Sequence, residues 1–158
     1  MRGFAIMSSC LSSLVFVATS PAQAGTASGT LEVSLTVLPG CSISAQPLAF
    51  TTRAGSAAQA EAAIDLHCSS DTLVAVSLDQ GRHAAGAQRR LLSESGQSVP
   101  YALYSDAARS HPWSGAPVAG QVSPDRALRL VAYGRIEAGD TLVPVGGYGD
   151  SVTVTVAF

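Results

Sequence analysis

The residues best suited to acid–base, metal or nucleophilic chemistry are spread thinly along the chain. The three histidines, His67, His83 and His111, lie far apart, and none has the spacing of metal ligands such as H-x-x-x-H or C-x-x-C. His67 precedes Cys68, but neighbours on a strand point to opposite faces, so they would not pair as base and nucleophile. We therefore expect no metal site and no cysteine nucleophile.

The sequence also lacks the short motifs of the common enzyme classes. It has no G-x-S-x-G nucleophile elbow and no phosphate-binding glycine loop. Its aspartates are scattered over segments predicted to be turns. Aspartates at such positions most often cap the turn by bonding to its backbone. Trp113 could serve as a ligand platform in its loop, although an aromatic side chain that closes the end of a sandwich is the commoner case. We predict that the protein is not an enzyme and needs no cofactor.

Residues 1–24 have the pattern of a secretory signal peptide. A single basic residue, Arg2, precedes a short apolar run, and Ala22-Gln23-Ala24 matches the A-x-A cleavage pattern. No later segment approaches the ~20 apolar residues of a membrane helix. We expect cleavage after Ala24, so that the mature chain starts near Gly25.

Disulfide formation is the chemistry that the sequence supports. Loss of the signal peptide removes Cys10 and leaves Cys41 and Cys68. An even pair of cysteines in an exported chain indicates a disulfide, because the compartments outside the cytosol are oxidising. A bridge that closes this loop would stabilise the fold by about 3.5 kcal/mol. That contribution is large beside the net stability of a domain of this size.

The charge composition excludes several partners and assembly routes. The chain has nine basic residues, all arginine, eleven acidic residues and a formal net charge of −2. A mildly negative chain without a basic cluster argues against nucleic acid as a partner. Without lysine, the chain cannot form the isopeptide bonds of sortase-built pili. The mature N-terminus also lacks the long apolar helix of type IV pilins.

Short alternating segments separated by turns indicate one all-β domain. Residues 30–37 alternate strictly between apolar and polar, which is typical of a half-buried strand. Residues 60–68 and 72–79 indicate two strands joined as in a hairpin, although 60–66 could instead form a short helix. The chain closes on 151–158, its most regular strand pattern. Further extended segments are expected at 41–50, 99–104, 128–136 and 142–145, with loops at 51–59, 80–90 and 107–120.

Stretches in both halves of the chain share the pattern of a known family. They are Tyr101–Arg109 with Trp113, Tyr133–Ile136 with Gly139, Gly147–Phe158, Gly29–Leu35, Gly40-Cys41 and Cys68. Together they resemble the spore coat protein U domain, a family that includes the subunits of archaic, Csu-type chaperone-usher pili. The resemblance covers essentially the whole mature chain.

The resemblance implies an all-β fold, namely an incomplete immunoglobulin-like sandwich that lacks its last strand and is completed by donor strand complementation. After the signal peptide predicted at 1–24, it implies a donor-strand extension at 25–38 and a pilin domain at 39–158. A periplasmic chaperone would lend a strand to the open groove, and the extension of the next subunit would replace it at an outer-membrane usher. The implied donor residues are Leu31, Val33, Leu35 and Val37, and the implied acceptor-groove and chaperone-binding residues are Val152, Val154, Val156 and Phe158.

The leading functional prediction is a structural subunit of a secreted fibre for adhesion or biofilm formation. It would pass through the periplasm to the cell surface and polymerise by donor strand exchange. Its expected partners are the chaperone, the usher, and other copies of itself or related pilins. Two alternatives stay open: a spore or cell coat protein exported by the same route, and a monomeric secreted binding module with Trp113 and its loop as the site.

Overall fold

The computed structural model describes residues 25–123 and 127–158. The predicted signal peptide at 1–24 lies outside the described residues. The chain separates into two units, the first ending at Thr36 and the second comprising Val37–Phe158. All the assigned strands belong to the second unit, which is called the domain below.

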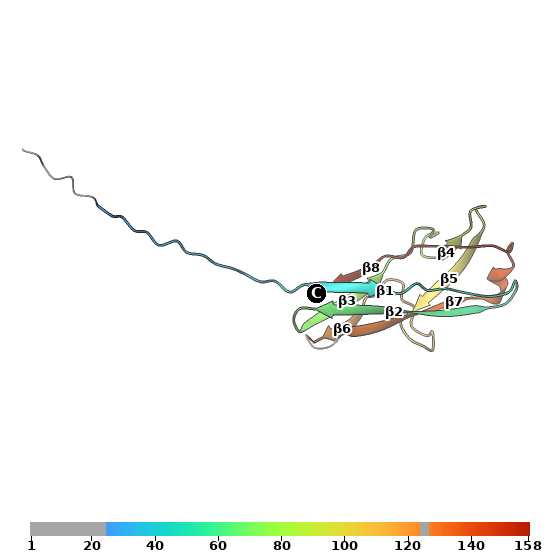
Figure 1. Ribbon diagram of the computed structural model, residues 1–158. Coiled ribbons are helices and arrows are strands. Elements are labelled where there is room, and N and C mark those ends of the chain that lie inside the picture. Colours follow the sequence, from blue (N-terminus) through green and yellow to red (C-terminus); the bar gives the residue numbers. More distant parts are fainter. Residues whose placement is uncertain (1–24, 124–126) are drawn as a thin grey trace, which may run out of the picture. The chain divides into compact units, whose positions relative to one another are not determined.

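Five antiparallel strands form the larger sheet of the domain, in the order β1-β2-β7-β5-β4. The long strands β2 and β7 run along most of the domain, and β1 lies at one edge (Figure 1). These strands are β1 (Cys41–Ala45), β2 (Ala58–Cys68), β4 (Arg89–Leu92), β5 (Ser98–Tyr104) and β7 (Leu128–Ile136).

The smaller sheet has three antiparallel strands. β3 (Thr72–Leu78) lies at its centre, between β6 (Val118–Val122) and β8 (Val154–Ala157). A short 3-10 helix, η1 (Ala138–Thr141), follows β7. The all-β prediction is therefore confirmed.

The core lies between the two sheets and is filled by side chains at alternate positions. In β3 and β5 every second residue is buried, as the period of a strand requires. The buried members are Val74, Val76 and Leu78 in β3, and Val99, Tyr101 and Leu103 in β5. Residues Leu66, Val76, Trp113 and Val122 have the largest fully buried side chains.

Trp113 belongs to this core, with 1% of its surface exposed. Its backbone N–H donates to the carbonyl of Leu103 in β5 (2.8 Å), and its indole N–H donates to the carbonyl of Val76 in β3 (3.2 Å). The ring therefore links the two sheets. The alternative in which Trp113 is a ligand platform is wrong, because no face of the ring is open.

β2 and β3 are consecutive in the chain but lie in different sheets, so the hairpin-like prediction is wrong. β1 and β7 occupy both edges of β2, and β3 pairs with β6 and β8 instead. The turn at 69–71 is a corner between the sheets. The strand interpretation of 60–66 is confirmed, because burial between neighbours outweighs the helix propensity of its alanines.

The predicted disulfide joins Cys41 to Cys68. The two residues are a cross-strand pair of β1 and β2, with their Cα atoms 4.1 Å apart. The bridge therefore fixes the first residue of the edge strand β1 to the last residue of its only neighbour among the described strands.

Three further segments differ from the sequence-based expectation. β4 begins inside the predicted loop at 80–90 and β6 inside the predicted loop at 107–120, because neither strand shows a clear alternation of apolar and polar residues. Residues 142–145, predicted as extended, are not in a strand. Pro144 lacks the N–H that a ladder needs, and Val145 is fully exposed.

Candidate functional site

The edge strand β1 leaves part of the core uncovered. Ile43 pairs with Leu66 across the strands and therefore shares its inward face. Leu66 is fully buried, yet Ile43 is 43% exposed, and the other residues of β1 after Cys41 are exposed too. An inward-facing isoleucine with this exposure indicates that no element covers it on the side away from β2.

The C-terminal segment directs three valines toward the core. Val152, Val154 and Val156, called the groove valines below, are half-buried and pack against the core, whereas Thr153 and Thr155 are exposed. The predicted inward parity of the segment is thus observed for the valines. Phe158 lies beyond the end of β8 and is 57% exposed. The strand itself is shorter than predicted, since residues 151–153 are not assigned to it.

Hydrogen bonds show which backbone groups of this segment are paired. The carbonyl of Thr153 accepts from the N–H of Asp79 (3.0 Å), and the carbonyl of Ser151 accepts from the N–H of Arg82 (3.0 Å). Successive residues of a strand direct their backbone groups to opposite edges, so those of the groove valines point away from β3. Among the described strands nothing pairs with that edge. It is therefore free to accept another strand.

Two adjoining cavities run between the segments 45–54 and 143–154. Their volumes are about 330 Å³ and about 570 Å³. Both are lined by Leu48, Phe50, Leu91 and Asp150. The smaller cavity reaches the core, since Ile64, Leu103, Ala132 and Val154 are among its lining residues. The smaller cavity lies between the end of β1 at Ala45 and the start of β8 at Val154, and the larger cavity continues from it between residues 48–54 and 143–150. Together the two cavities are called the groove.

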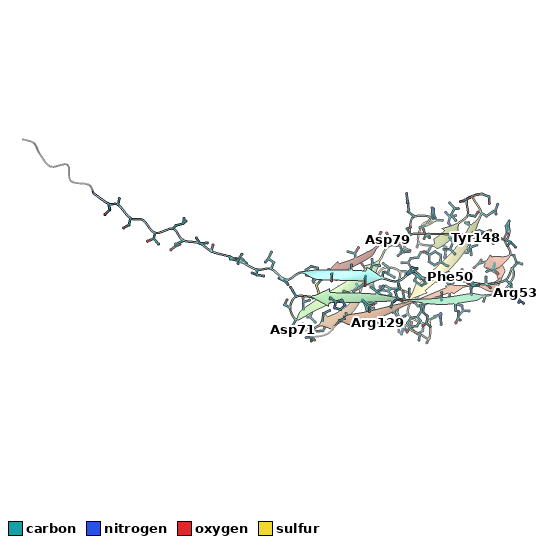
Figure 2. All side chains as sticks on the ribbon, in the orientation of Figure 1. Phe50, Arg53, Asp71, Asp79, Arg129 and Tyr148 are labelled. Atoms are coloured by element: carbon teal, nitrogen blue, oxygen red, sulfur yellow. A yellow bond between two sulfur atoms is a disulfide. The ribbon has the colours of Figure 1, made fainter. Side chains whose placement is uncertain are left out.

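A close approach of backbone and side chains shapes the floor of the groove. Leu48 and Phe50 lie against Gly134 of β7, where a Cβ atom would meet the Phe50 ring at 2.6 Å. The ring of Phe50 also packs against that of Tyr101, with centroids 6.2 Å apart. Phe50 and Tyr148, labelled in Figure 2, come from the two segments that flank the groove. Glycine at 134 therefore allows Leu48 and Phe50, in the segment after β1, to pack directly against β7.

Asp150 is a buried acid that lines both cavities of the groove. Its side chain is 2% exposed. One carboxylate oxygen accepts from the hydroxyl of Tyr101 (2.7 Å), and the other accepts from the backbone N–H of His83 (3.1 Å). Burial, together with the bond to Asp150, raises the pKa of Tyr101, so its hydroxyl keeps its proton and remains a donor. These bonds satisfy both oxygens of Asp150.

The N-terminal unit carries the predicted donor residues. No strand is assigned to residues 25–40, so the half-buried strand predicted at 30–37 is wrong for the single chain. Leu31, Val33 and Leu35 are 85–86% exposed, and Val37 is 82% exposed. A strand needs a partner for its backbone groups, and alternation alone does not supply one.

The described residues hold neither a metal site nor a membrane helix. Within 25–123 and 127–158, no three side chains of histidine, cysteine, aspartate or glutamate come together as metal ligands. No helix in this part of the chain is long and apolar enough to cross a membrane.

Comparison with known families identifies the domain. Residues 27–155 match the Spore Coat Protein U domain. The chain belongs to this family. Among curated protein sequences, none matches significantly.

Solved structures that match this Spore Coat Protein U domain include two chaperone complexes. One is the pre-assembly complex of the chaperone CsuC with the tip adhesion subunit CsuE, from archaic chaperone-usher Csu pili of Acinetobacter baumannii (27% identity, TM-score 0.62). It covers 78% of this chain, which spans 40% of the matched chain. The other is a chaperone–tip adhesin complex of CFA/I fimbriae (10% identity, TM-score 0.46), covering 72% of this chain and 40% of that one.

The family match and the similarity to a pilus tip adhesion subunit support a pilus-related role. Sequence reasoning predicted the inward parity of the groove valines. It missed β1 as the second edge of the opening, the floor residues Leu48 and Phe50, and Asp150. A glycine within a strand pattern often marks a close backbone approach, so Gly134 was the available signal for the floor. For Asp150 the sequence offered no signal that separates it from a turn-capping aspartate.

Proposed function

We propose that this protein is a structural subunit of a chaperone-usher surface fibre used in adhesion or biofilm formation, polymerised by donor strand exchange. Residues 25–38 of one copy, called the extension below, insert into the groove between β1 and β8 of the next copy. The donor residues Leu31, Val33, Leu35 and Val37 then face the cavities, and the polar residues between them face solvent. This is strand addition to an open sheet edge.

A single observation carries the proposal: the domain is open along an unpaired edge directly over its own core. The groove valines offer unpaired backbone groups and apolar side chains at the same positions. The same chain has an exposed alternating segment that lacks a partner. Each of these features is an aggregation hazard in isolation, and pairing between copies removes both hazards.

The energetics favour insertion into a preformed groove. Burial of one valine or leucine side chain stabilises by roughly 1.5–3 kcal/mol, and four such side chains share one face of the extension. Ordering the backbone opposes this, so the extension stays unstructured until a groove accepts it. Hydrogen bonds to the groove valines add to the apolar contribution and select an extended conformation.

A subunit with an open core needs protection before assembly. We infer that a periplasmic chaperone lends a strand to the groove and that an outer-membrane usher exchanges it for the extension of the next copy. The structure of CsuC with CsuE, in which a chaperone is bound to a pilus subunit, supports this partner. Export by the predicted signal peptide, cleaved after Ala24, would deliver the chain to the periplasm and then to the cell surface.

A coat protein exported by the same route is the second candidate, favoured by the name of the family. It would use the same groove but form a layer on the cell or spore instead of an extended fibre. Electron microscopy of cells that express the gene with its neighbours separates the two. A monomeric binding module is disfavoured, because Trp113 is buried and the sandwich is open.

A pair of adjacent charge substitutions in the extension tests the proposal. In Val33→Arg, the charge enters the groove of the next copy, where an unpaired buried charge costs several kcal/mol. We expect chaperone binding and the melting temperature of that complex to stay as in the wild type, while fibre formation fails.

Glu32→Arg is the matched control, because Glu32 lies on the opposite face of the extension. It should change stability by about 0.5 kcal/mol or less and leave fibres intact. Chaperone-complex yield, melting temperature and fibre formation are measured for both variants. A Val33→Arg chain that misfolds before it meets a neighbour, or that forms normal fibres, would contradict the proposal.

A further inference from the structure

The segment that leads into β8 is held by main-chain and side-chain hydrogen bonds. Gly149 exchanges two backbone bonds with Leu92 of β4 (2.9 Å each), and the carbonyls of Ser151 and Thr153 accept from residues that follow β3. The ladder between β3 and β8 ends at the pair of Leu78 and Val154. Before it, the backbone N–H of Thr153 donates to a carboxylate oxygen of Asp79 (2.9 Å), and the N–H of His83 donates to a carboxylate oxygen of Asp150 (3.1 Å). Two aspartates thus take the places that backbone carbonyls have in a regular ladder.

Asp150 connects this segment to both sheets. Tyr101, which donates its hydroxyl to Asp150, belongs to β5 of the larger sheet. His83 follows β3 of the smaller sheet, and its Nδ1 atom lies 3.1 Å from the same carboxylate oxygen that its N–H reaches. A single carboxylate therefore fixes residue 150 relative to two elements that flank the groove.

Neighbouring residues lie close around the Asp150 carboxylate. Gly81 has a φ of 80°, and a Cβ atom there would collide with the Asp150 carboxylate. Beside it, the buried Arg89 donates to the backbone carbonyls of Asp79 (2.9 Å) and Leu78 (3.3 Å). Arg89 thereby closes the end of β3 next to Asp150 and brings a positive charge close to the buried acid.

Asp150 also lies where the two cavities of the groove adjoin, two residues before the first of the groove valines. Anchoring of residue 150 sets the direction of the following backbone. Val152 then faces the cavity, and its backbone groups face the free edge. Main-chain bonds hold the neighbouring residues Gly149, Ser151 and Thr153, and the side chain of Asp150 is the contact that fixes residue 150 between them.

We propose that Asp150 is a positioning residue for donor-strand binding, which holds the start of the acceptor edge extended and open through Tyr101 and His83. This inference rests on the proposed function and deepens it, since it names the group that prepares the groove for the incoming strand. The proposal does not require a contact between Asp150 and the apolar side chains of the donor. Its effect on binding is transmitted by the backbone of residues 150–153.

Uptake of a labelled synthetic peptide of residues 25–38 tests the role of Asp150. The parent protein is the full mature chain with Val33→Arg, whose own extension is disabled as a donor while its groove is unchanged. Peptide affinity and melting temperature are measured for the parent, for Asp150→Asn and for Tyr101→Phe. Loss of a buried charged hydrogen bond predicts about tenfold weaker peptide binding for Asp150→Asn and about threefold weaker binding for Tyr101→Phe.

Val122→Ala is the control for a general loss of stability. Val122 is 1% exposed and lies in β6, on the far side of β3 from the acceptor edge. It should lower the melting temperature but change peptide affinity less than twofold. If Asp150→Asn fails to fold, Tyr101→Phe decides alone, since it removes one hydroxyl and keeps the ring.

The outcomes distinguish a failure of the positioning role of Asp150 from a failure of the proposed donor-strand exchange. Normal peptide affinity in Tyr101→Phe and Asp150→Asn, or a loss in Val122→Ala of the same size for the same change in melting temperature, overturns the positioning role and leaves the proposed function intact. A parent chain that takes up no peptide overturns the proposed function and the inference with it.

Discussion

Two alternating segments of this chain have nearly the same sequence pattern but different structures. Residues 30–37 and residues 151–158 both place an apolar side chain at every second position. The C-terminal segment pairs with β3, and its valines pack against the core. The N-terminal segment is in no strand, and its apolar side chains are exposed. The difference is the presence of a neighbouring strand in the same chain.

This contrast shows what alternation specifies. It determines which side chains share a face, and both segments obey that parity. It does not determine which strand becomes the neighbour, since that depends on which edges of the sheets are still free. In the proposed fibre, residues 30–37 of one copy pair with the free edge of residues 151–158 in the next copy.

Among the substitutions considered, a charge placed on the inward face of β8 should have the largest effect on stability. Val154→Arg puts a charge on the core side of the C-terminal segment, and we expect it to destabilise the domain by roughly 3 kcal/mol or more. Thr155→Arg, on the exposed side, should change stability by about 0.5 kcal/mol or less. Thermal unfolding of the purified chain, alone or with its chaperone, measures both. Equal effects at 154 and 155 would contradict the inward parity of the groove valines.

Acid should weaken the C-terminal segment by a smaller amount, through Asp79. Burial raises the pKa of this carboxyl, but hydrogen bonds from Thr153 and from the Gly81 N–H outweigh that effect and hold the pKa below the usual 3.8. A folded-state pKa below the unfolded value stabilises the fold above about pH 4, and the contribution is lost as the pH falls through the folded value. We expect a lower melting temperature and weaker amide protection of Thr153 below that pH.

Asp79→Asn should flatten this acid dependence at Thr153. Asp106→Asn is its control. Although burial opposes ionisation there too, hydrogen bonds from His111 and Ser110 hold the pKa of Asp106 at about 2. Asp106 thus contributes to acid sensitivity in a loop that does not touch the C-terminal segment. An Asp79→Asn chain in which protection of Thr153 still falls in acid as in the wild type would count against this anchoring.

The sequence predicted most of the larger features of the domain. The alternating runs at 99–104 and 128–136 correspond to β5 and β7, because both faces of those strands have distinct environments. The cysteine pair was enough to predict the disulfide. β4 and β6 were not predicted, because Arg89 points inward from β4 and Gly120 interrupts β6. An inward-pointing arginine that donates hydrogen bonds to backbone carbonyls cannot be recognised from the pattern of apolar residues.

The groove was predicted only in part, for a physical reason. Parity placed the groove valines on the inward face, but the floor at Leu48 and Phe50 depends on tertiary approach to Gly134. The cross-sheet bonds of Asp150 join residues up to 67 positions apart. A local sequence pattern cannot indicate a contact between residues so far apart along the chain.

Amide hydrogen exchange of assembled fibres tests the central claim most directly. In the unassembled Val33→Arg chain, the odd-numbered amides of β8, paired with β3, should be protected, and the amides of the groove valines should exchange freely. In wild-type fibres the amides of the groove valines should become protected as well, together with alternate amides of residues 30–37. Fibres in which the groove valines exchange as fast as in the unassembled chain would contradict insertion of the extension at this edge.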